Sequence, residues 1–168
     1  RYMRNNWRVW LNKLYVCMDL KKWDEGIQAA NELLNFKKKK DLNKDLVDIE
    51  EKVIRGMLVG IVEKLQEGGG MEEGNIDRKG SIDSARRTAG RFEELLERMC
   101  AEMRTEFWVF EVLAVFREIS GQGDEAVLDA MMKTHRCLTL GFSGWEKDEG
   151  KYGKVCKLCV KMSKIVVR

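Results

Sequence analysis

Apolar residues recur every three or four positions along most of this chain, which is the spacing of the buried face of an amphipathic helix. The steadiest stripe lies in the segment 82–103, where apolar positions alternate four and three apart. Similar stripes elsewhere, together with the complete absence of proline, favour helix throughout. We therefore predict an all-α fold of about seven helices, over approximately residues 7–20, 24–36, 42–66, 82–103, 107–119, 124–140 and 145–167.

Residues that favour helix ends stand at several of these predicted boundaries. Asn6 is available to cap the first helix, Thr105 is a candidate cap for the fifth, and Gly141 ends the sixth. Ser143 and Glu146 have the Ser-x-x-Glu spacing of a capping box, so the seventh helix is expected to start there.

Two segments with the same internal spacing, Trp7–Lys40 and Phe107–Leu140, fit one helix-turn-helix repeat of about 34 residues. Trp10 and Phe110 take the aromatic position of the first helix, and Gly121 closes that helix in the second segment. Small residues at set positions let neighbouring helices pack closely. This register is that of tetratricopeptide repeats, which stack helix pairs into a right-handed solenoid.

The fit to this repeat has departures. Gly26 stands where alanine is usual, Ala30 and Ala130 stand where an aromatic residue is usual, and Cys17 and Arg117 replace the expected tyrosine. An ordinary antiparallel helix bundle is the alternative fold, and we favour the repeat.

The segment between the two units, 41–106, is expected to be a third unit that is stretched by longer helices and by a Gly-rich loop at 67–80. The residues Glu67–Asn75 are acidic and Gly-rich, so they are expected to form a mobile loop. They do not resemble a phosphate-binding loop, because no strand precedes them and no Gly-Lys-Ser/Thr follows.

Composition narrows the function classes. The chain has 168 residues, 44% hydrophobic and 35% charged, with 31 basic and 28 acidic residues. This near balance argues against direct nucleic-acid binding, which needs a concentrated excess of Lys and Arg on one face. The run Lys37–Lys40 alone keeps a minor RNA-associated option open. The longest apolar run is far short of a bilayer span, so no membrane association is expected.

A search for chemistry finds few candidates. His135 is the only histidine, and Cys156 and Cys159 form the only Cys-x-x-Cys motif. The two thiols are expected on the core face of the last helix. The alternative is a Cys-based redox or zinc-binding helical module that uses Cys137, His135, Cys156 and Cys159. We expect no enzymatic activity, no cofactor, no metal and no small-molecule substrate.

Protein binding is the function that remains. In a helix-pair solenoid the first helix of each pair lines the concave surface, so side chains beside its core stripe are the candidates for partner contact. These are Arg8, Asn12, Tyr15, Glu111 and Glu118. Glu111 and Glu118 would repel a terminal carboxylate, so we expect no clamp of the kind that grips the acidic C-terminus of a chaperone.

Several short motifs add a family resemblance. In the order in which they occur, they resemble the C-terminal repeats of the tetratricopeptide repeat protein 27 family over nearly the whole chain: Asn6–Asn12, Asp19 with Trp23–Ala29, Val53–Met57, Phe107–Phe110 and Gly144–Asp148. The resemblance implies a non-enzymatic adaptor, associated with chaperone-assisted assembly of the U5 spliceosomal particle, in the cytoplasm or nucleus. It implies no catalytic or cofactor-binding residue.

The chain ends also carry expectations. Arg1 is not an initiator Met and the first element already belongs to a repeat, so we expect a piece of a longer array. The last helix has no second helix to cover it, so its outer face is expected to be adhesive in isolation. Five cysteines without disulfide-scaffold density favour a reducing compartment.

Overall fold

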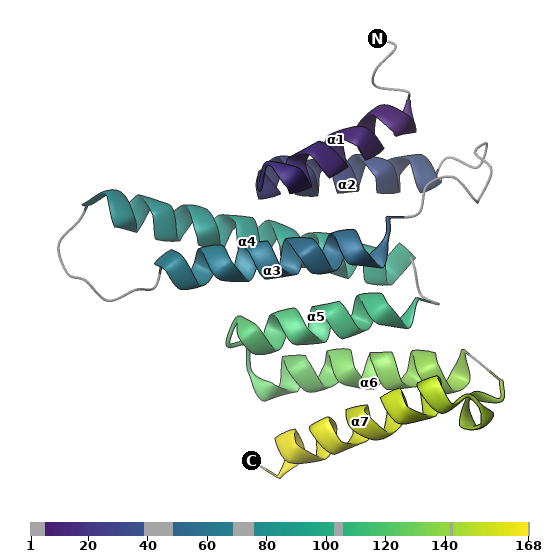
Figure 1. Cartoon of the computed structure of the whole chain (residues 1–168). Helices are drawn as coiled ribbons and strands as arrows, with labels where there is room; N and C mark the ends of the chain where they lie inside the picture. The colour runs from purple at the N-terminus through teal and green to yellow at the C-terminus, as the bar shows by residue number, and fades with distance from the viewer. Residues whose placement is uncertain (1–5, 39–48, 69–75, 103–105, 142, 168) are drawn as a thin grey trace. The chain divides into compact units, whose positions relative to one another are not determined.

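The predicted helices are present in a computed structural model, which describes residues 6–38, 49–68, 76–102, 106–141 and 143–167. Within these ranges the chain forms helices and no strand, and the all-α helix-turn-helix prediction is confirmed (Figure 1). The helices are α1 (Trp7–Asp19), α2 (Trp23–Lys38), α3 (Glu51–Gly68), α4 (Ile76–Glu102), α5 (Phe107–Ile119), α6 (Asp124–Leu140) and α7 (Glu149–Val166), with a short 3₁₀ helix at Trp145–Lys147.

The chain divides into two compact units, residues 1–95 and 96–168, and the boundary falls inside α4. No helix in the described ranges combines the length and the apolar character needed to span a bilayer.

The first unit is built on the antiparallel pair α1 and α2, which Figure 1 shows side by side. Asn6 caps α1 as predicted, since its side-chain oxygen accepts the backbone N–H of Arg8 at 3.0 Å. One apolar stripe of α2 is fully buried, as is Leu14 of α1, against which α2 packs. The stripe consists of Ile27, Ala30, Leu33 and Leu34.

A third helix closes over this pair through glycines. α3 contacts both α1 and α2. Gly60 of α3 lies directly against the ring of Trp23, and Gly26 of α2 lies against the Met57 methyl group, where an added Cβ would be 2.8 Å away. The missing side chains let the helices approach closely, which explains the departure from alanine at Gly26.

A polar contact holds α4 to the same unit. The buried Thr88 hydroxyl donates a hydrogen bond to Asp24 Oδ2 at 2.9 Å, and Arg91 pairs with Asp24 Oδ1 at 3.1 Å. Asp24 sits in the first turn of α2, where a carboxylate also complements the helix dipole.

The second unit repeats the pair architecture with α5 and α6, and α7 packs against α6. The bounds of α5 and α6 match the prediction, and Gly141 is the C-cap of α6. Within the described ranges, α7 buries only the side that faces α6. Val155 is its single buried residue, and Leu158, Met162 and Ile165 are half-buried.

Three predicted boundaries are wrong. The third helix starts at Glu51 and not at residue 42, because Ile49 and Glu50 are not helical and the Glu50 carbonyl accepts the first helical bonds from Val53 and Ile54. Its predicted residues 42–48 lie outside the described ranges, as do the side chains of the run 37–40.

The fourth helix begins at Ile76, inside the predicted 67–80 loop, whose residues 69–75 are not described. Residues 76–79 contain no helix breaker, and each residue added to a formed helix gains a hydrogen bond. The single Gly80 costs only about 1 kcal/mol in a helix interior, so it does not stop the helix.

The predicted capping box at Ser143 is wrong as well. Gly144 adopts φ +82°, the short 3₁₀ helix follows, and Asp148 caps α7 by accepting the backbone N–H of Lys151 at 3.1 Å. An ionised aspartate caps at least as well as serine and adds a favourable charge at the helix start, so the later site prevails. The N-cap position of α5 is Glu106, and the predicted cap Thr105 is not among the described residues.

The turns of the two helix pairs match bond for bond, one hundred positions apart. In the first, the N–H of Lys21 donates to Met18 and that of Lys22 to Cys17; in the second, Gly121 donates to Glu118 and Gln122 to Arg117. This is the Schellman pattern, whose central residue takes a left-handed conformation. Gly121 has φ +69° and Lys21 has φ +54°.

The left-handed conformation of Lys21 predicts that glycine at this position would change the stability of the chain. Lys21→Gly is expected to raise the free energy of unfolding by about 1 kcal/mol, because a left-handed L-residue costs that much and glycine does not. Gly121→Ala is expected to lower it by about 1 kcal/mol for the same reason. Urea unfolding followed by circular dichroism measures both. Lys22→Gly is the control, and a Lys21→Gly variant no more stable than that control would count against the strain.

Candidate functional site

The predicted contact residues of α1 lie on one side of that helix. Arg8, Asn12 and Tyr15 are spaced four and three apart, which places them in one row. Arg8 and Asn12 are exposed, and Tyr15 is half-buried. The Arg8 guanidinium lies 5.4 Å from the centroid of the Trp7 ring, which orients it by a cation–π contact.

Tyr15 has a structural contact as well as a surface position. Its hydroxyl donates a hydrogen bond to Glu50 Oε1 at 2.9 Å, and Glu50 pairs with Lys52 at 2.7 Å. Burial, followed by the hydrogen bond to Glu50, raises the pKa of Tyr15, and the bonds from Lys52 and Tyr15 lower the pKa of Glu50. Tyr15 therefore ties α1 to the start of α3, and Arg8 and Asn12 are the freer part of the row.

The predicted residues of α5 form a second row. Glu111 is half-buried, and Glu118 is exposed seven positions later. This row lies in the second unit, and the α1 row lies in the first. Their use in partner contact stays a prediction.

A pocket in the second unit was not foreseen from the sequence. It has a volume of about 860 Å³ and opens between the end of α4, α5 and α6. Its walls are largely apolar, and basic groups stand at its edge. The residues that line it include Cys100, Phe110, Leu113, Cys137, Arg117 and Arg136.

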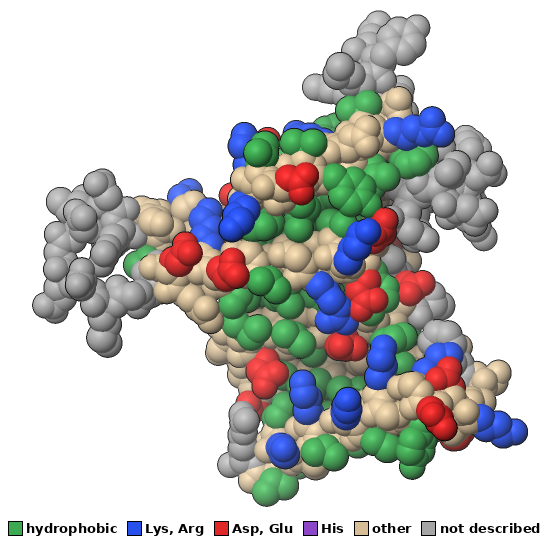
Figure 2. All heavy atoms as spheres, in the orientation of Figure 1, with side chains coloured by type: hydrophobic (Ala, Val, Ile, Leu, Met, Phe, Trp, Pro, Cys, Tyr) green, Lys and Arg blue, Asp and Glu red, His purple; other side chains and the backbone are tan. Residues whose placement is uncertain are grey.

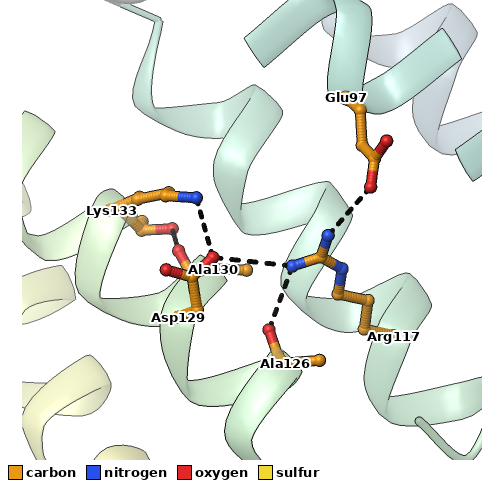
Figure 3. Close-up of polar contacts among 7 residues, drawn as sticks. Glu97, Arg117, Ala126, Asp129, Ala130 and Lys133 are labelled. Carbon is orange, nitrogen blue, oxygen red and sulfur yellow. Dashed lines mark hydrogen bonds and ion pairs between the residues drawn. The ribbon is translucent and has the colours of Figure 1, made fainter. Parts of the chain in front are cut away.

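One arginine connects the three helices around this pocket (Figure 3). Arg117 of α5 pairs with Glu97 of α4 at 3.1 Å, and it donates to the Ala126 carbonyl of α6 at 3.1 Å. Its Nη1 also lies 3.7 Å from Asp129 Oδ2, and Asp129 in turn pairs with Lys133 at 2.7 Å. The Arg117 side chain is only 13% exposed, so its apolar stem is packed against its neighbours while its guanidinium makes these polar contacts. At this position, where tyrosine is usual in the repeat, Arg117 contacts both α4 and α6.

The two thiols that line the pocket, those of Cys100 and Cys137, have low reactivity. Burial raises the pKa of Cys100 to about 12, and burial also raises the pKa of Cys137, to which the charge of Glu106 adds. Both thiols are therefore protonated at neutral pH, and they act as small apolar groups in the wall. The pocket is suited to hold an apolar side chain of another molecule.

The expectation that Cys156 and Cys159 lie on the core face is wrong. Both are exposed, because α7 packs against α6 along a narrow stripe centred on Val155. His135 and Cys137 are half-buried on α6. Within the described ranges, no three His, Cys, Asp or Glu side chains are grouped so as to hold a metal ion. The redox or zinc alternative gains no support from this arrangement.

Comparison with known proteins gives one similarity. The chain is 36% identical over 50 residues to a TPR repeat-containing protein of the fission yeast Schizosaccharomyces pombe. The aligned segment covers 30% of this chain and 6% of the yeast protein, so the chain corresponds to a small part of that relative. No family model matches the chain, and no solved structure matches it significantly.

Proposed function

We propose that this chain is a non-enzymatic protein-interaction scaffold built from tetratricopeptide-like helix pairs. The observation that carries the proposal is the repetition of one helix-turn-helix unit, with the same two turn hydrogen bonds at Lys21 and Gly121. Repeated helix pairs of this kind present extended surfaces that bind other proteins. The local similarity to a TPR repeat-containing protein supports the same reading.

The binding surfaces follow from the exposed rows of the first helix in each pair. Arg8 and Asn12 offer a cation and an amide on α1, and Glu118 offers an exposed carboxylate on α5. The pocket lined by Phe110 and Leu113 adds an apolar site for a partner side chain. Charged rows set the choice of partner, and a buried apolar anchor contributes most of the affinity.

A narrower proposal rests on the motif resemblance to the tetratricopeptide repeat protein 27 family. It is that the chain acts as an adaptor in chaperone-assisted assembly of the U5 spliceosomal particle, in the cytoplasm or the nucleus. Co-purification of U5 proteins and a chaperone with the tagged chain, and their loss when Trp145–Asp148 is replaced by Gly-Ser residues, would support it. Recovery of binding partners unrelated to that particle would count against it.

Charge reversal tests the scaffold function itself. Arg8→Glu and Glu111→Lys are expected to reduce recovery of at least one partner protein by about tenfold, because rim charges steer association and select partners. The measurement is affinity purification of the tagged chain followed by quantitative mass spectrometry. Circular dichroism checks that helicity is unchanged.

The matched control reverses the same two charge types elsewhere. Arg86 and Glu94 are exposed residues of α4, and Arg86→Glu with Glu94→Lys leaves the α1 and α5 rows intact. The control is expected to retain the partner. Equal loss in control and test variants, or unchanged recovery in both, would contradict the assignment of these rows.

A further inference from the structure

The positive charge of this chain is concentrated on its last helix. From Gly150 to Arg168 the sequence holds five lysines, one arginine and no acidic residue, which leaves 25 basic and 28 acidic residues elsewhere. The near balance of basic and acidic residues in the whole chain therefore conceals a local excess of positive charge, and this segment can form a charged binding face. Figure 2 shows Lys and Arg side chains following α7, the yellow helix of Figure 1.

Four of these lysines form one row on α7. They are spaced three, four and three apart, which keeps them on one side of a helix over about 15 Å. We call this the lysine row: Lys154, Lys157, Lys161 and Lys164. All four are exposed.

The row differs from the charged residues of the other helices. In α3, α4 and α6 a basic residue pairs with a carboxylate four positions away: Arg55 with Glu51, Arg98 with Glu102 and Lys133 with Asp129. In the described part of the chain, Lys157, Lys161 and Lys164 make no ion pair, and Lys154 lies over the Phe107 ring at 4.6 Å. Like charges at these spacings repel one another, and an acidic partner would relieve that repulsion.

An apolar side chain borders the lysine row. Val160 is 53% exposed and lies one turn from both Lys157 and Lys164. A phosphate backbone has no apolar group to cover this side chain. Phosphate recognition also favours arginine, whereas every basic residue within α7 is a lysine. Tyr152 is half-exposed, but its ring already stacks on Trp145 at 6.2 Å, so it is not an open platform for bases.

We propose that the lysine row of α7 is a docking surface for an acidic amphipathic helix of a partner protein. The partner would place carboxylates three and four residues apart against the four lysines, and an apolar side chain against Val160. This inference rests on the proposed scaffold function and names the chemistry of one partner. The four lysines do not belong to the α1 or α5 rows, and the surface needs no free C-terminal carboxylate on its partner.

The test uses the full chain and a designed probe. The probe is a labelled peptide of about 20 residues, amidated at its C-terminus, with glutamates alternately three and four apart and a leucine beside them. Fluorescence anisotropy is expected to show that Lys157→Gln/Lys161→Gln/Lys164→Gln weakens binding about tenfold or more. The variant that carries arginine at all three positions should keep the affinity. Binding should weaken as salt rises.

Matched controls distinguish an effect of the lysine row from an effect of the net charge of the chain. Lys21→Gln/Lys64→Gln/Arg86→Gln removes the same charge from the first unit, and it should bind the probe like the unmodified chain. A peptide of equal composition with scrambled glutamate spacing should bind at least about threefold more weakly, since its carboxylates no longer share one face. Equal binding by both triple variants, or by both peptides, would overturn the proposal.

Two other polyanions complete the experiment. A single-stranded uridine oligonucleotide and phosphatidylserine vesicles are titrated under the same conditions. Tighter binding of either one through the same lysines would overturn the choice of an acidic helix. If the probe fails while the Arg8 and Glu111 variants still lose a partner, the α7 inference falls and the scaffold function stands.

Discussion

Replacing Gly60 by leucine is expected to lower the free energy of unfolding by about 3 kcal/mol. A Cβ on Gly60 would overlap the ring of Trp23, lying 2.6 Å from Cε2. Trp23 opens α2 and is half-buried against α3, so leucine at position 60 would force the large indole ring to move away from α3 or force α2 and α3 apart. Leucine favours the helix over glycine by less than about 1 kcal/mol. This gain in stability is too small to offset the cost of the overlap with Trp23.

Denaturant unfolding followed by circular dichroism and tryptophan fluorescence measures this effect. Gly90→Leu is the matched control, because Gly90 is an exposed helical glycine with no atom within 4 Å of an added Cβ. It is expected to leave stability unchanged or to raise it slightly. In the double variant Trp23→Ala/Gly60→Leu, the added cost of leucine should largely vanish. Equal stability of Gly60→Leu and Gly90→Leu would contradict the close approach of α2 and α3.

Replacing Arg117 by methionine is expected to lower the free energy of unfolding by about 2 kcal/mol. The change removes the bonds to Glu97 and to the Ala126 carbonyl, but it keeps most of the apolar stem. Glu97 and Asp129 are about half exposed, so water stabilises their charges after the loss and limits the cost. The effect comes mainly from the hydrogen bonds of one guanidinium that joins three helices.

Thermal and urea unfolding check this prediction against a neighbour. Arg136 lies on the edge of the same pocket and is exposed, so Arg136→Met should change stability by no more than about 0.5 kcal/mol. In a Glu97→Gln background the cost of Arg117→Met should fall, because one of its bonds is already weakened. Equal effects at Arg117 and Arg136 would show that the Arg117 network contributes nothing.

Much of the fold follows from periodicity and turn chemistry. The stripes around Leu14 and Phe110 and the glycine at position 121 predict α1, α5 and α6 to within one residue. The predicted helix boundaries are wrong where two sequence signals for a helix end compete. Asp148 displaces the Ser143 capping box, and α4 extends through Gly80 because one glycine does not end a long helix.

The packing between helices is harder to read from a sequence. Gly60 gives no signal in the pattern, because its role depends on which residue of another helix faces it, and that residue is Trp23. The pocket depends in the same way on the approach of three helices around Arg117. The face on which a residue lies is predicted only in part: Arg8 and Asn12 are exposed on α1 as expected, but Cys156 and Cys159 are exposed on α7 and not on its core face. The lysine row could have been found from its spacing and from the absence of acidic residues after Glu149.

We propose above that this chain acts by holding another protein against its helix pairs. The most direct measurement is hydrogen exchange of the chain with and without a partner protein that it recovers. We expect slower exchange in peptides from α1, α5 or both, with α2 little changed. Unchanged exchange throughout α1 and α5 in the presence of a saturating partner would contradict it.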